Sequence, residues 1–486
     1  MTARRAFLGI DCGTQSTKAL LLDPEGEILA VGRADHDLIE ASDGTREQEP
    51  RWWTEAAVTA VRAALAAAGG VEVGGIGVSG QQHGLVALDA NDQPVRPAKL
   101  WNDTSTTAEA QALTHALGGE SAVLALTGNL FLPGYTAPKV AWLRDHEPDR
   151  YAASRRFCLP HDYLNLWLTG TYATEPGDAS GTAYVDARSR SYSRRVLAAL
   201  DDERDWDAAL PPIGESLAVH GRLQRTTAEL LGLPAGVPVS GGGGDNMCSA
   251  IGVGAVAEGP TVVSLGTSGT AFAFHSRPAI DDEGEAAAFC SSTGGWLPLV
   301  CTLNCTVATE WIRRVMGMDR RGFEAALSAS PPGARGVSCL PYLAGERTPN
   351  APSAAAAFSG IRTGHDRNDL VRAVAEGVIL GLAYGLGALA RAGCHPTEIT
   401  LVGGGAASDG LAQLCADAFD LPVRRDAEPE AAALGAARQA ACVVDSIPLP
   451  GPADSGERFE PRSAEALRAA GERLALLRAD AVARER

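Results

Sequence analysis

The chain has 486 residues, with 42 Lys and Arg against 59 Asp and Glu, a formal net charge of −17, and 45% hydrophobic residues. This length exceeds one ordinary hydrophobic core, so two or more domains are expected. The acidic charge repels phosphate backbones and argues against nucleic-acid binding as the main task. It does not exclude one compact phosphate site built from backbone N–H groups and a cation.

The N-terminus and the cysteines indicate the compartment. The first residues carry two Arg before an apolar run that is too short for a signal-peptide core. No uninterrupted apolar run approaches the roughly 20 residues of a membrane-spanning helix. The cysteines Cys290, Cys301 and Cys305 come closest to a cluster, but they lack CxxC spacing and a nearby pair of His. We therefore predict a reduced, cytoplasmic protein with no membrane partner.

The stretch LGIDCGTQSTKALLLD, residues 8–23, contains two apolar runs joined by a turn rich in hydroxyl groups. The first run ends on Asp11, and Gly13, Thr14 and Lys18 follow before the second run. The pattern predicts strand, turn and strand. On its own it is equally compatible with a β-hairpin whose turn is merely polar.

The next predicted elements alternate between helix and strand. Residues 50–68 predict a helix, because Pro50 suits a first-turn position and Gly69 a stop. The segment VEVGGIGVSGQQHG, residues 71–84, then reads as a buried strand running into a loop. This order predicts an α/β fold built of layers.

The second half repeats these devices in the same order. TVVSLGTSGTAFAF, residues 261–274, is again strand, Gly-Thr turn and strand, and EITLVGGGAASDG, residues 398–410, is again a strand running into glycines. Between the halves, VSGGGGDN, residues 239–246, ends a strand on a glycine run. We expect two domains of similar architecture that face each other across a cleft.

The expected organisation has three parts. An N-terminal domain spans residues 1–243 and a C-terminal domain spans residues 244–444. The latter contains one long helix at 367–393, whose Gly residues permit close packing. The remainder, residues 445–486, is rich in Pro and then helical and charged, and we expect a surface appendage there.

The two Gly-Thr turns predict a polyphosphate site. Turns of Gly and small hydroxyl residues expose successive N–H groups that form an anion-binding nest, and Thr14 and Thr267 add hydroxyl donors. Cellular polyphosphates carry Mg²⁺, which one or two carboxylates hold together with water and phosphate oxygens, so Asp11 is a candidate metal ligand. Lys18 is a candidate counter-charge for the transferred phosphoryl group, although a Lys on a turn is more often merely solvated.

Two further glycine-rich segments add chemistry. LVGGGAASDG suits close approach of the backbone to adenine and ribose, but an ordinary strand-to-helix turn explains it as well. Asp245 follows the glycine run Gly241 to Gly244, so it could take a proton from a substrate hydroxyl that attacks a γ-phosphate, with Asn246 bonding a polyol. A structural Asp in a glycine turn is the alternative.

Two polar groups at predicted strand ends suit a hydroxylated sugar. QQHG supplies Gln82 and His83, and WND supplies Trp101, Asn102 and Asp103. Their amides, imidazole and aromatic face are appropriate as a set, whereas a lone His is usually structural. The chain contains no GxxxxGK[ST] loop and no GxSxG elbow, which excludes a P-loop enzyme and gives no sign of a hydrolase nucleophile.

Together these motifs resemble the FGGY carbohydrate kinases, within the actin/Hsp70/hexokinase-like ATPase superfamily. The resemblance covers residues 9 to about 440, and GQQHG, WND, PGYTAPK and GDN make it specific. The motifs that carry it are GIDCGTQSTK (9–18), GVSGQQHG (77–84), LWND (100–103), TGNLFLPGYTAPK (127–139), LPHDYLNLWLTG (159–170), DASGT (178–182), GGGGDN (241–246), LGTSG (265–269), LPYLAGERTP (340–349) and VGGGA (402–406).

The resemblance implies two ribonuclease-H-like domains with ATP and sugar in the cleft, and Asp245 as the catalytic base. It implies Asp11 as the Mg²⁺ ligand. The implied sugar-binding residues are Gln82, His83, Trp101, Asn102, Asp103, Asp245 and Asn246. The implied ATP-binding residues are Thr14, Gln15, Lys18, Gly266, Thr267, Gly404, Gly405 and Ser408.

The likeness is strongest to members that phosphorylate D-xylulose to D-xylulose 5-phosphate, and it suggests a homodimer. One departure bears on the sugar: many relatives have a basic residue shortly after WND, where this chain has Thr104 and Ser105. Two alternatives stay open. One is a kinase of the same family for ribulose, ribitol or glycerol. The other is a non-metabolic relative, namely an actin-like or chaperone-like ATPase or a sugar sensor. Asp245 with the polar QQHG and WND set argues against it, because a chaperone needs no group that polarises a sugar.

Overall fold

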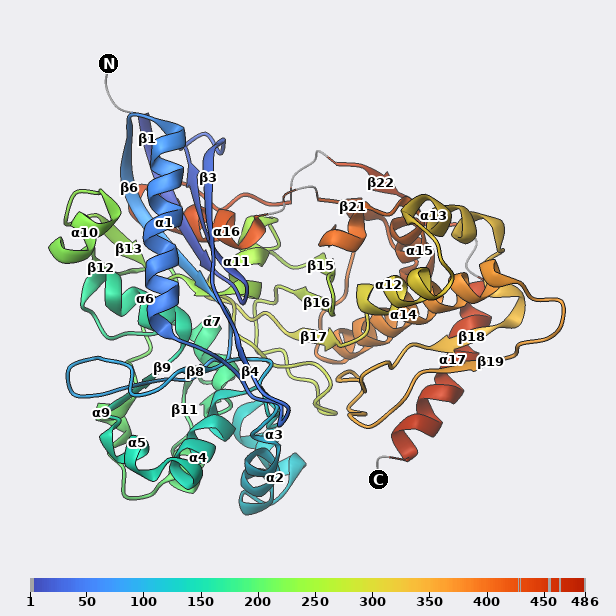
Figure 1. Ribbon diagram of the computed structural model, residues 1–486, viewed down its shortest axis with the longest axis horizontal. Helices are drawn as coiled ribbons and strands as arrows, with labels where there is room; N and C mark the ends of the chain where they lie inside the picture. The colour runs from blue at the N-terminus through green and yellow to red at the C-terminus, as the bar shows by residue number, and fades with distance from the viewer. Residues whose placement is uncertain (1–3, 427, 429, 453–455, 463–464, 485–486) are drawn as a thin grey trace.

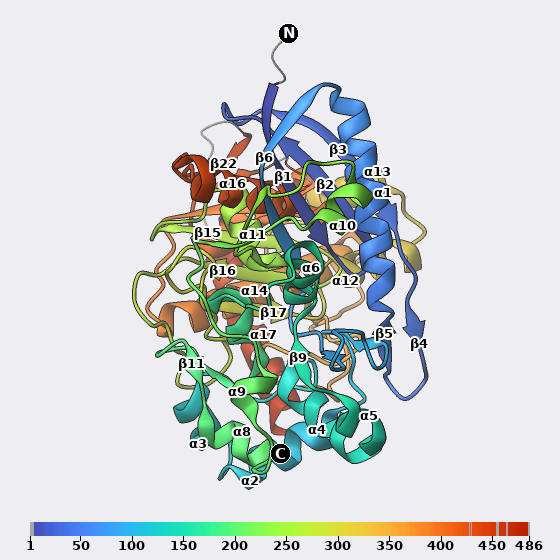
Figure 2. The same ribbon diagram turned by 90° about the vertical axis from the view of Figure 1, so that its left-hand side faces the viewer.

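Two sheets, one from each half of the chain, form the centre of the protein. The computed structural model describes residues 4–426, 428, 430–452, 456–462 and 465–484. In Figure 1 the first sheet lies on the left beside α1 (Pro50–Ala68), and α14 (Arg367–Arg391) lies on the right with the second half. Figure 2 shows the first half from its own side, with α1 running along the sheet.

The first sheet has the strand order β12-β13-β6-β1-β2-β3. The expected strand–turn–strand at residues 8–23 is confirmed: β1 pairs antiparallel with β2, and β6 runs parallel to β1. The strands are β1 (Arg4–Cys12), β2 (Ser16–Leu22), β3 (Ile28–Asp35), β6 (Val71–Gly80), β12 (Val219–Arg222) and β13 (Pro238–Ser240), and the short β14 (Gly243–Gly244) pairs with the end of β6.

The second sheet has the order β22-β21-β20-β15-β16-β17 and repeats the first strand by strand. Each has three antiparallel strands, then two parallel strands, then an antiparallel edge strand. Its strands are β15 (Pro260–Leu265), β16 (Gly269–Ala273), β17 (Leu299–Thr302), β20 (Glu398–Val402), β21 (Val423–Arg425) and β22 (Arg458–Phe459). The α/β class and the internal repeat predicted from the sequence are confirmed.

Helix α1 forms where the sequence predicts it. Pro50 occupies its first turn, and Gly69 ends it in a positive-φ conformation with φ of 59°. Its buried face includes Trp53 and Val61, which pack in the core of the first sheet. Burial of each such apolar side chain contributes about 1.5–3 kcal/mol.

A helix from the second half of the chain packs on the first sheet. Helix α16 (Ala431–Asp445) packs on β1 and β6, and α11 (Asp245–Gly252) packs on α16. A Cβ on Gly9 would lie 1.9 Å from the Ala433 carbonyl oxygen, so only glycine lets β1 and α16 approach this closely. The predicted division between residues 243 and 244 follows the sequence repeat, but the packing crosses it.

The C-terminal segment is integrated into the second half, whereas the sequence led us to expect an appendage. Strand β22 is the sixth strand of the second sheet, and α17 (Glu465–Ala483) packs against α14. Leu467 and Leu474 on α17 are buried. A two-residue strand inside a Pro-rich stretch has no periodicity to detect, which explains the missed pairing.

Helix α14 begins at the predicted residue and ends two residues earlier than expected. It is long and apolar enough to cross a membrane by length and composition, but 67% of its most apolar window is buried inside the protein. Packing in the second core therefore explains its composition.

Shorter helices complete the two halves. They are α2 (Thr107–Ala116), α3 (Glu120–Thr127), α4 (Thr136–His146), α5 (Pro148–Ala153), α6 (Pro160–Thr169), α7 (Pro176–Ala179), α8 (Arg194–Leu200), α9 (Trp206–Ala209), α10 (Arg225–Leu231), α12 (Thr306–Val315), α13 (Arg320–Ala329) and α15 (Asp409–Phe419). The minor strands are β4 (Ile39–Glu40), β5 (Arg46–Gln48), β7 (Val86–Leu88), β8 (Ala98–Lys99), β9 (Arg156–Cys158), β10 (Val185–Asp186), β11 (Ser191–Tyr192), β18 (Ser338–Leu340) and β19 (Ala357–Ser359).

Candidate active site

Three parallel strands end side by side and bring distant residues together. In the sheet register Asp11 on β1 lies beside Ser79 on β6, and Ser79 lies beside Gly243 on β14. The Ser79 hydroxyl donates a hydrogen bond to Asp11 Oδ1 at 2.7 Å. Helix α11 begins at Asp245, two residues after Gly243. The carboxylates of Asp11 and Asp245 thus belong to one edge of the first sheet, where ligands of α/β sheets commonly bind.

Asp245 has the environment of a general base. Its Oδ1 accepts hydrogen bonds from the Asn246 backbone N–H at 2.8 Å and from Asn246 Nδ2 at 3.1 Å. Burial raises the pKa of Asp245 to about 7, and the negative charges of Asp11 and Asp178 add to this rise. A carboxylate with a pKa near neutrality can take a proton from a substrate and return it to water.

Gln82 joins Asp245 through Asn246. The side-chain Nδ2 of Asn246 donates to Gln82 Oε1 at 2.9 Å. The other end of the Gln82 amide, Nε2, is buried and has no hydrogen-bond partner among the described residues. A buried donor without a partner is unusual in a folded protein and suits a ligand hydroxyl. The structure therefore brings together three of the residues predicted for the sugar.

His83 presents a hydrogen-bond acceptor. Its backbone has φ of 65°, and its Nδ1 lies 2.7 Å from the Gly181 carbonyl oxygen, which can only accept. Burial lowers the pKa of His83 to about 3, with the Lys139 charge contributing. The imidazole is therefore neutral with its proton on Nδ1, which leaves Nε2 free to accept a hydrogen bond.

The first Gly-Thr turn is held by side chains from elsewhere in the first half. Trp101 Nε1 donates to the Thr14 hydroxyl at 2.9 Å, and Gln48 Nε2 donates to the Thr14 carbonyl at 2.8 Å. Gln15, at the tip of the turn, is exposed. Trp101, predicted as a sugar-binding face, therefore holds the first Gly-Thr turn in this structure.

Lys18, the predicted counter-charge for a phosphoryl group, has an acidic partner in this structure. It lies opposite Asp11 in the pairing of β1 with β2, and its Nζ forms an ion pair with Glu430 at 2.6 Å. Because Glu430 precedes α16, this pair adds a polar contact where α16 meets the first sheet. The Lys18 charge is thus already compensated before any phosphate binds.

The WND segment contributes only in part. Asp103 is fully buried, and its carboxylate binds Lys99 Nζ at 3.1 Å and the Arg46 backbone N–H at 2.8 Å. These partners, together with Ser105, already occupy the Asp103 oxygens, and sugar binding by Asp103 stays a prediction. Asn102 has a buried Oδ1 without a partner among the described residues and stays a candidate.

The second Gly-Thr turn and the second glycine run line one large cavity of 1210 Å³. The predicted ATP residues that line it are Gly266, Thr267, Gly404, Gly405 and Ser408. Ser408 also caps α15 by accepting a hydrogen bond from the Leu411 backbone N–H at 3.0 Å. These residues come from β15, β20 and the loops after them, so the structure assembles this part of the prediction.

Arginines that line the 1210 Å³ cavity were not predicted from the sequence. Four lie on α12, α13 and α14, namely Arg313, Arg320, Arg321 and Arg372, and Arg462 follows β22. Arg313 and Arg372 form ion pairs with Glu310 and Glu376, so the charges of the other three suit an anionic ligand better. The only available signal was the clustering of Arg on two short amphipathic helices, which is also typical of an ordinary solvated face.

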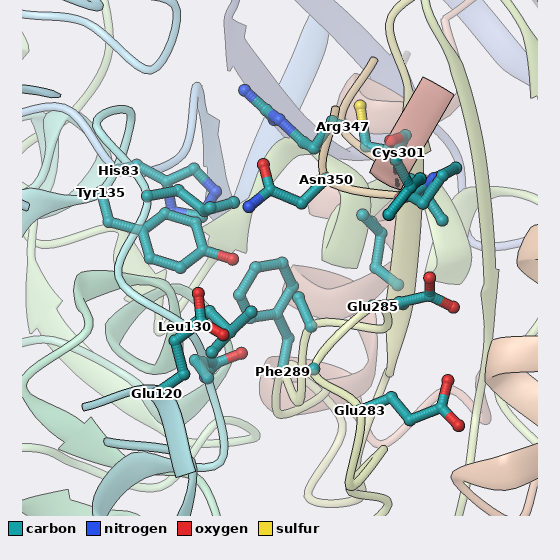
Figure 3. Close-up of a pocket in the computed structure, with 18 residues that line it drawn as sticks. His83, Glu120, Leu130, Tyr135, Glu283, Glu285, Phe289, Cys301, Arg347 and Asn350 are labelled. Carbon is teal, nitrogen blue, oxygen red and sulfur yellow. Dashed lines mark hydrogen bonds between the residues drawn. The ribbon is translucent and has the colours of Figure 1, made fainter. Parts of the chain in front are cut away.

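A second cavity of 370 Å³ adjoins His83 and lies between the two halves (Figure 3). His83 and Tyr135 from the first half line one side, and Cys301, Arg347 and Asn350 from the second half line the other. Tyr135 and Arg347 belong to the motifs PGYTAPK and GERTP. From the sequence, these motifs indicate only the family resemblance, and no role was predicted for Tyr135 or Arg347.

Asp178 is another carboxylate that the sequence analysis did not select. It is fully buried beneath Gly244, and its Oδ2 lies 3.4 Å from His161 Nδ1. Burial raises the pKa of Asp178 to about 7. His161 Nε2 lies 2.6 Å from the Gly241 carbonyl oxygen. Asp178 and His161 therefore pack against the glycine run that precedes Asp245.

Comparison with known proteins places the whole chain in one group. Residues 6–252 match the N-terminal domain model, and residues 261–443 the C-terminal domain model, of the FGGY family of carbohydrate kinases. The chain is 43% identical over 442 residues to the xylulose kinase of Haemophilus influenzae, covering 89% of this chain and 90% of that relative.

Solved structures agree with the sequence comparison. The crystal structure of a "xyloylose kinase" from Brucella ovis has a TM-score of 0.92 and 35% identity, covering 97% of this chain and 98% of the other. The xylulose kinase of Bifidobacterium adolescentis has a TM-score of 0.85 and 32% identity, covering 97% and 99%.

Proposed function

The chain belongs to the FGGY family of carbohydrate kinases, and we propose that it transfers the γ-phosphoryl group of ATP to D-xylulose, giving D-xylulose 5-phosphate and ADP. The sugar is inferred from relatives named xylulose kinase that match this chain at up to 43% identity over most of its length. A divalent cation, typically Mg²⁺, accompanies ATP in this kind of reaction.

The position of Asp245 carries this assignment. It starts α11 at the edge of the first sheet, next to a polar set formed by Gln82 and Asn246, and its pKa is raised to about 7. A nucleotide-driven chaperone needs no carboxylate of this kind beside polar groups suited to hydroxyls. The arrangement therefore favours a kinase over an ATPase without an acceptor.

In the proposed reaction the Asp245 carboxylate accepts the proton of the attacking hydroxyl. The 5-hydroxyl of the sugar gives its proton to the Asp245 carboxylate as its oxygen forms a bond to the γ-phosphorus, and the bond from that phosphorus to the β,γ-bridging oxygen breaks. Asn246 holds the Asp245 carboxylate through two hydrogen bonds and keeps it oriented. Gln82 and His83 offer an unpaired donor and an acceptor for the remaining hydroxyls.

The 1210 Å³ cavity suits the nucleotide. Gly404 and Gly405 line it where adenosine would approach the backbone, and Gly266 and Thr267 offer N–H and hydroxyl donors to phosphates. The turn at Thr14, which follows Asp11 in the first half, would offer further donors to the phosphates. Binding of both substrates would draw the halves together and exclude water, so we expect weak ATP hydrolysis without sugar.

Asp11 fits a magnesium site. No group of three or more metal-binding side chains lies together in the described part of the chain, but Mg²⁺ carried by ATP needs only one or two carboxylates. Asp11 is a buried carboxylate at a strand end, and its charge already acts on Asp245. Asp11 would hold the ion, which when bound neutralises phosphate charge.

A kinase for another polyol is the alternative, because Thr104 and Ser105 stand where many relatives carry a basic residue. The test is a coupled ADP-release assay with Mg·ATP and D-xylulose, L-ribulose, D-ribulose, ribitol and glycerol in parallel. A clear preference for D-xylulose supports the proposal. Preference for another acceptor would keep the kinase assignment, and residues 82–105 would then have to explain the different sugar specificity. Release of ADP that no sugar stimulates would rule out a sugar kinase.

A further inference from the structure

The 370 Å³ cavity beside His83 contains a positive charge on a firmly held loop. Arg347 lies in the loop after β18, next to Glu346. The buried Glu346 carboxylate accepts hydrogen bonds from the Leu303 backbone N–H at 2.5 Å and from Asn304 Nδ2 at 3.0 Å. Thr348 donates to the Cys301 carbonyl at 3.0 Å. These contacts fix the backbone on both sides of Arg347.

The Arg347 guanidinium has no carboxylate partner within ion-pair distance in the described segments. Figure 3 shows Arg347 and Asn350 reaching toward the side of the cavity where His83 and Tyr135 lie. A Cβ built on Gly134 would lie 3.9 Å from Arg347 Nη2, so the guanidinium reaches the segment that carries Tyr135. Its charge also contributes to the lowered pKa of His83. The second half thus extends a charged donor toward the sugar-binding residues of the first.

The chemistry of this pair matches one end of a ketose. Arg347 can only donate hydrogen bonds, and His83 Nε2 can only accept. A ketone oxygen can only accept, and the hydroxyl beside it can donate. If the C2 carbonyl accepts a hydrogen bond from Arg347 and the C1 hydroxyl donates one to His83 Nε2, each of these four groups has a hydrogen-bond partner. A polyol has a C2 hydroxyl instead; its oxygen could still accept from Arg347, but its hydrogen would need a separate acceptor, which Arg347 is not.

We propose that the cavity between His83 and Arg347 binds the non-reacting C1–C2 end of the ketose, and that Arg347 is a specificity residue that donates to the C2 carbonyl. This proposal rests on the proposed function, because it assigns the opposite end of the same sugar. The C5 hydroxyl lies at Asp245, and the C1–C2 end lies where both halves contribute. Sugar binding thereby links the two halves directly.

The decisive experiment compares the wild-type protein with Arg347→Met, which keeps an unbranched stem, shorter than that of arginine, and removes the guanidinium donors. The KM for D-xylulose should rise about 10- to 100-fold, as expected for loss of a hydrogen bond to a charged group, with most of the change in KM and little in kcat. The inhibition constant of xylitol, which differs from D-xylulose only in having a C2 hydroxyl, should rise much less. The ratio of the xylitol inhibition constant to the KM for D-xylulose should therefore be smaller in the variant than in the wild type.

Two further variants complete the design. Arg347→Lys keeps the charge without the guanidinium fork, and a smaller rise in the KM for D-xylulose, about 3- to 10-fold, is expected. It decides the proposal if Arg347→Met does not fold. Arg362→Met removes an exposed arginine that does not line this cavity and should match the wild type. Melting temperatures establish that each variant is folded.

The outcomes separate this proposal from the proposed function. If the wild type does not phosphorylate D-xylulose, the proposed function fails. If the wild type is active and Arg347 variants keep the KM for D-xylulose, the assignment of Arg347 is wrong. It is also wrong if kcat falls while KM stays, or if D-xylulose and xylitol weaken equally.

Discussion

The side-chain amide of Asn246 lies 2.9 Å from Gln82 Oε1, and this hydrogen bond joins the start of α11 to the loop after β6. The same Nδ2 group also donates to Asp245 at 3.1 Å. One amide therefore aligns the proposed base with a residue proposed to hold the sugar. The unpaired Nε2 of Gln82 is left to bind the ligand.

Replacement of Asp245 by Asn should remove the proton acceptor and keep the shape of the site. We expect kcat for D-xylulose to fall about 10²- to 10⁴-fold, with KM changed only a few-fold. The coupled assay measures both. Asp282→Asn, which changes an exposed carboxylate, is the matched control and should behave as the wild type. Full activity of Asp245→Asn would refute the role of Asp245 as base.

The same variant should change the pH dependence of stability. The pKa of Asp245 rises from 3.8 to about 7 on folding, so the folded state holds this proton between these values while the unfolded state releases it. The protein is therefore stabilised at low pH, and this contribution is lost as the pH rises through about 7. Above neutral pH the wild type must bury an ionised Asp245 carboxylate, whereas the replaced side chain of Asp245→Asn is uncharged and has no such unfavourable free energy.

Asp245→Asn should accordingly be more stable than the wild type at pH 8, by at most about 4 kcal/mol, and equal to it at pH 3 if it is folded there. Urea denaturation at several pH values gives the free energy of unfolding. Asp178 titrates in the same range and its charge raises the pKa of Asp245, so the difference between the two proteins reports Asp245 together with its coupling to Asp178. A difference that does not depend on pH would contradict the raised pKa.

Replacement of Asp11 by Asn should weaken the use of magnesium. Loss of a carboxylate ligand is expected to raise the Mg²⁺ concentration for half-maximal activity at least about tenfold, with partial recovery at high Mg²⁺. Titration of Mg²⁺ at fixed ATP measures this. Ser79→Ala removes only the hydroxyl that bonds Asp11 and should have a smaller effect. An unchanged Mg²⁺ requirement in Asp11→Asn would exclude Asp11 as a ligand.

Gly404 tests the nucleotide cavity without disturbing the fold. A Cβ at this position meets no atom within 4 Å, so Gly404→Ala should leave stability unchanged. If adenosine occupies that space, the KM for ATP should rise about tenfold, which corresponds to about 1.4 kcal/mol. At Gly405, in contrast, a Cβ would lie 2.8 Å from Leu265 Cβ, so Gly405→Ala should also destabilise the fold. An unchanged KM for ATP in Gly404→Ala places the nucleotide elsewhere.

Gly9 tests the contact between the halves. Gly9→Ala places a methyl group 1.9 Å from the Ala433 carbonyl oxygen, where two pieces of backbone must separate. The free energy of unfolding should fall by about 1–3 kcal/mol or more. Gly364→Ala has open space for its Cβ and serves as the control. Denaturation curves of the two variants that coincide would show that α16 can move away from β1 freely.

Local patterns predicted much of the architecture. The two Gly-Thr hairpins, α1 and α14 could be placed because apolar periodicity and Gly or Pro punctuation act over a few residues. The repeat of these devices correctly predicted two similar sheets. Strand β22 and the burial of α17 could not be predicted, because a two-residue strand depends on pairing with β21 for its existence.

The amino-acid sequence alone specifies the chemical groups that this protein possesses, among them the carboxylates Asp11 and Asp245, the QQHG amides and the two Gly-Thr turns. Which of these groups are free to act depends on the partners that the folded chain brings to them. Asp103 and Lys18 are occupied by Lys99 and Glu430, while Arg347 enters the cavity beside His83 from the other half. The reason is physical, since a charged side chain pairs with whichever opposite charge the fold brings near, and that partner can lie hundreds of residues away.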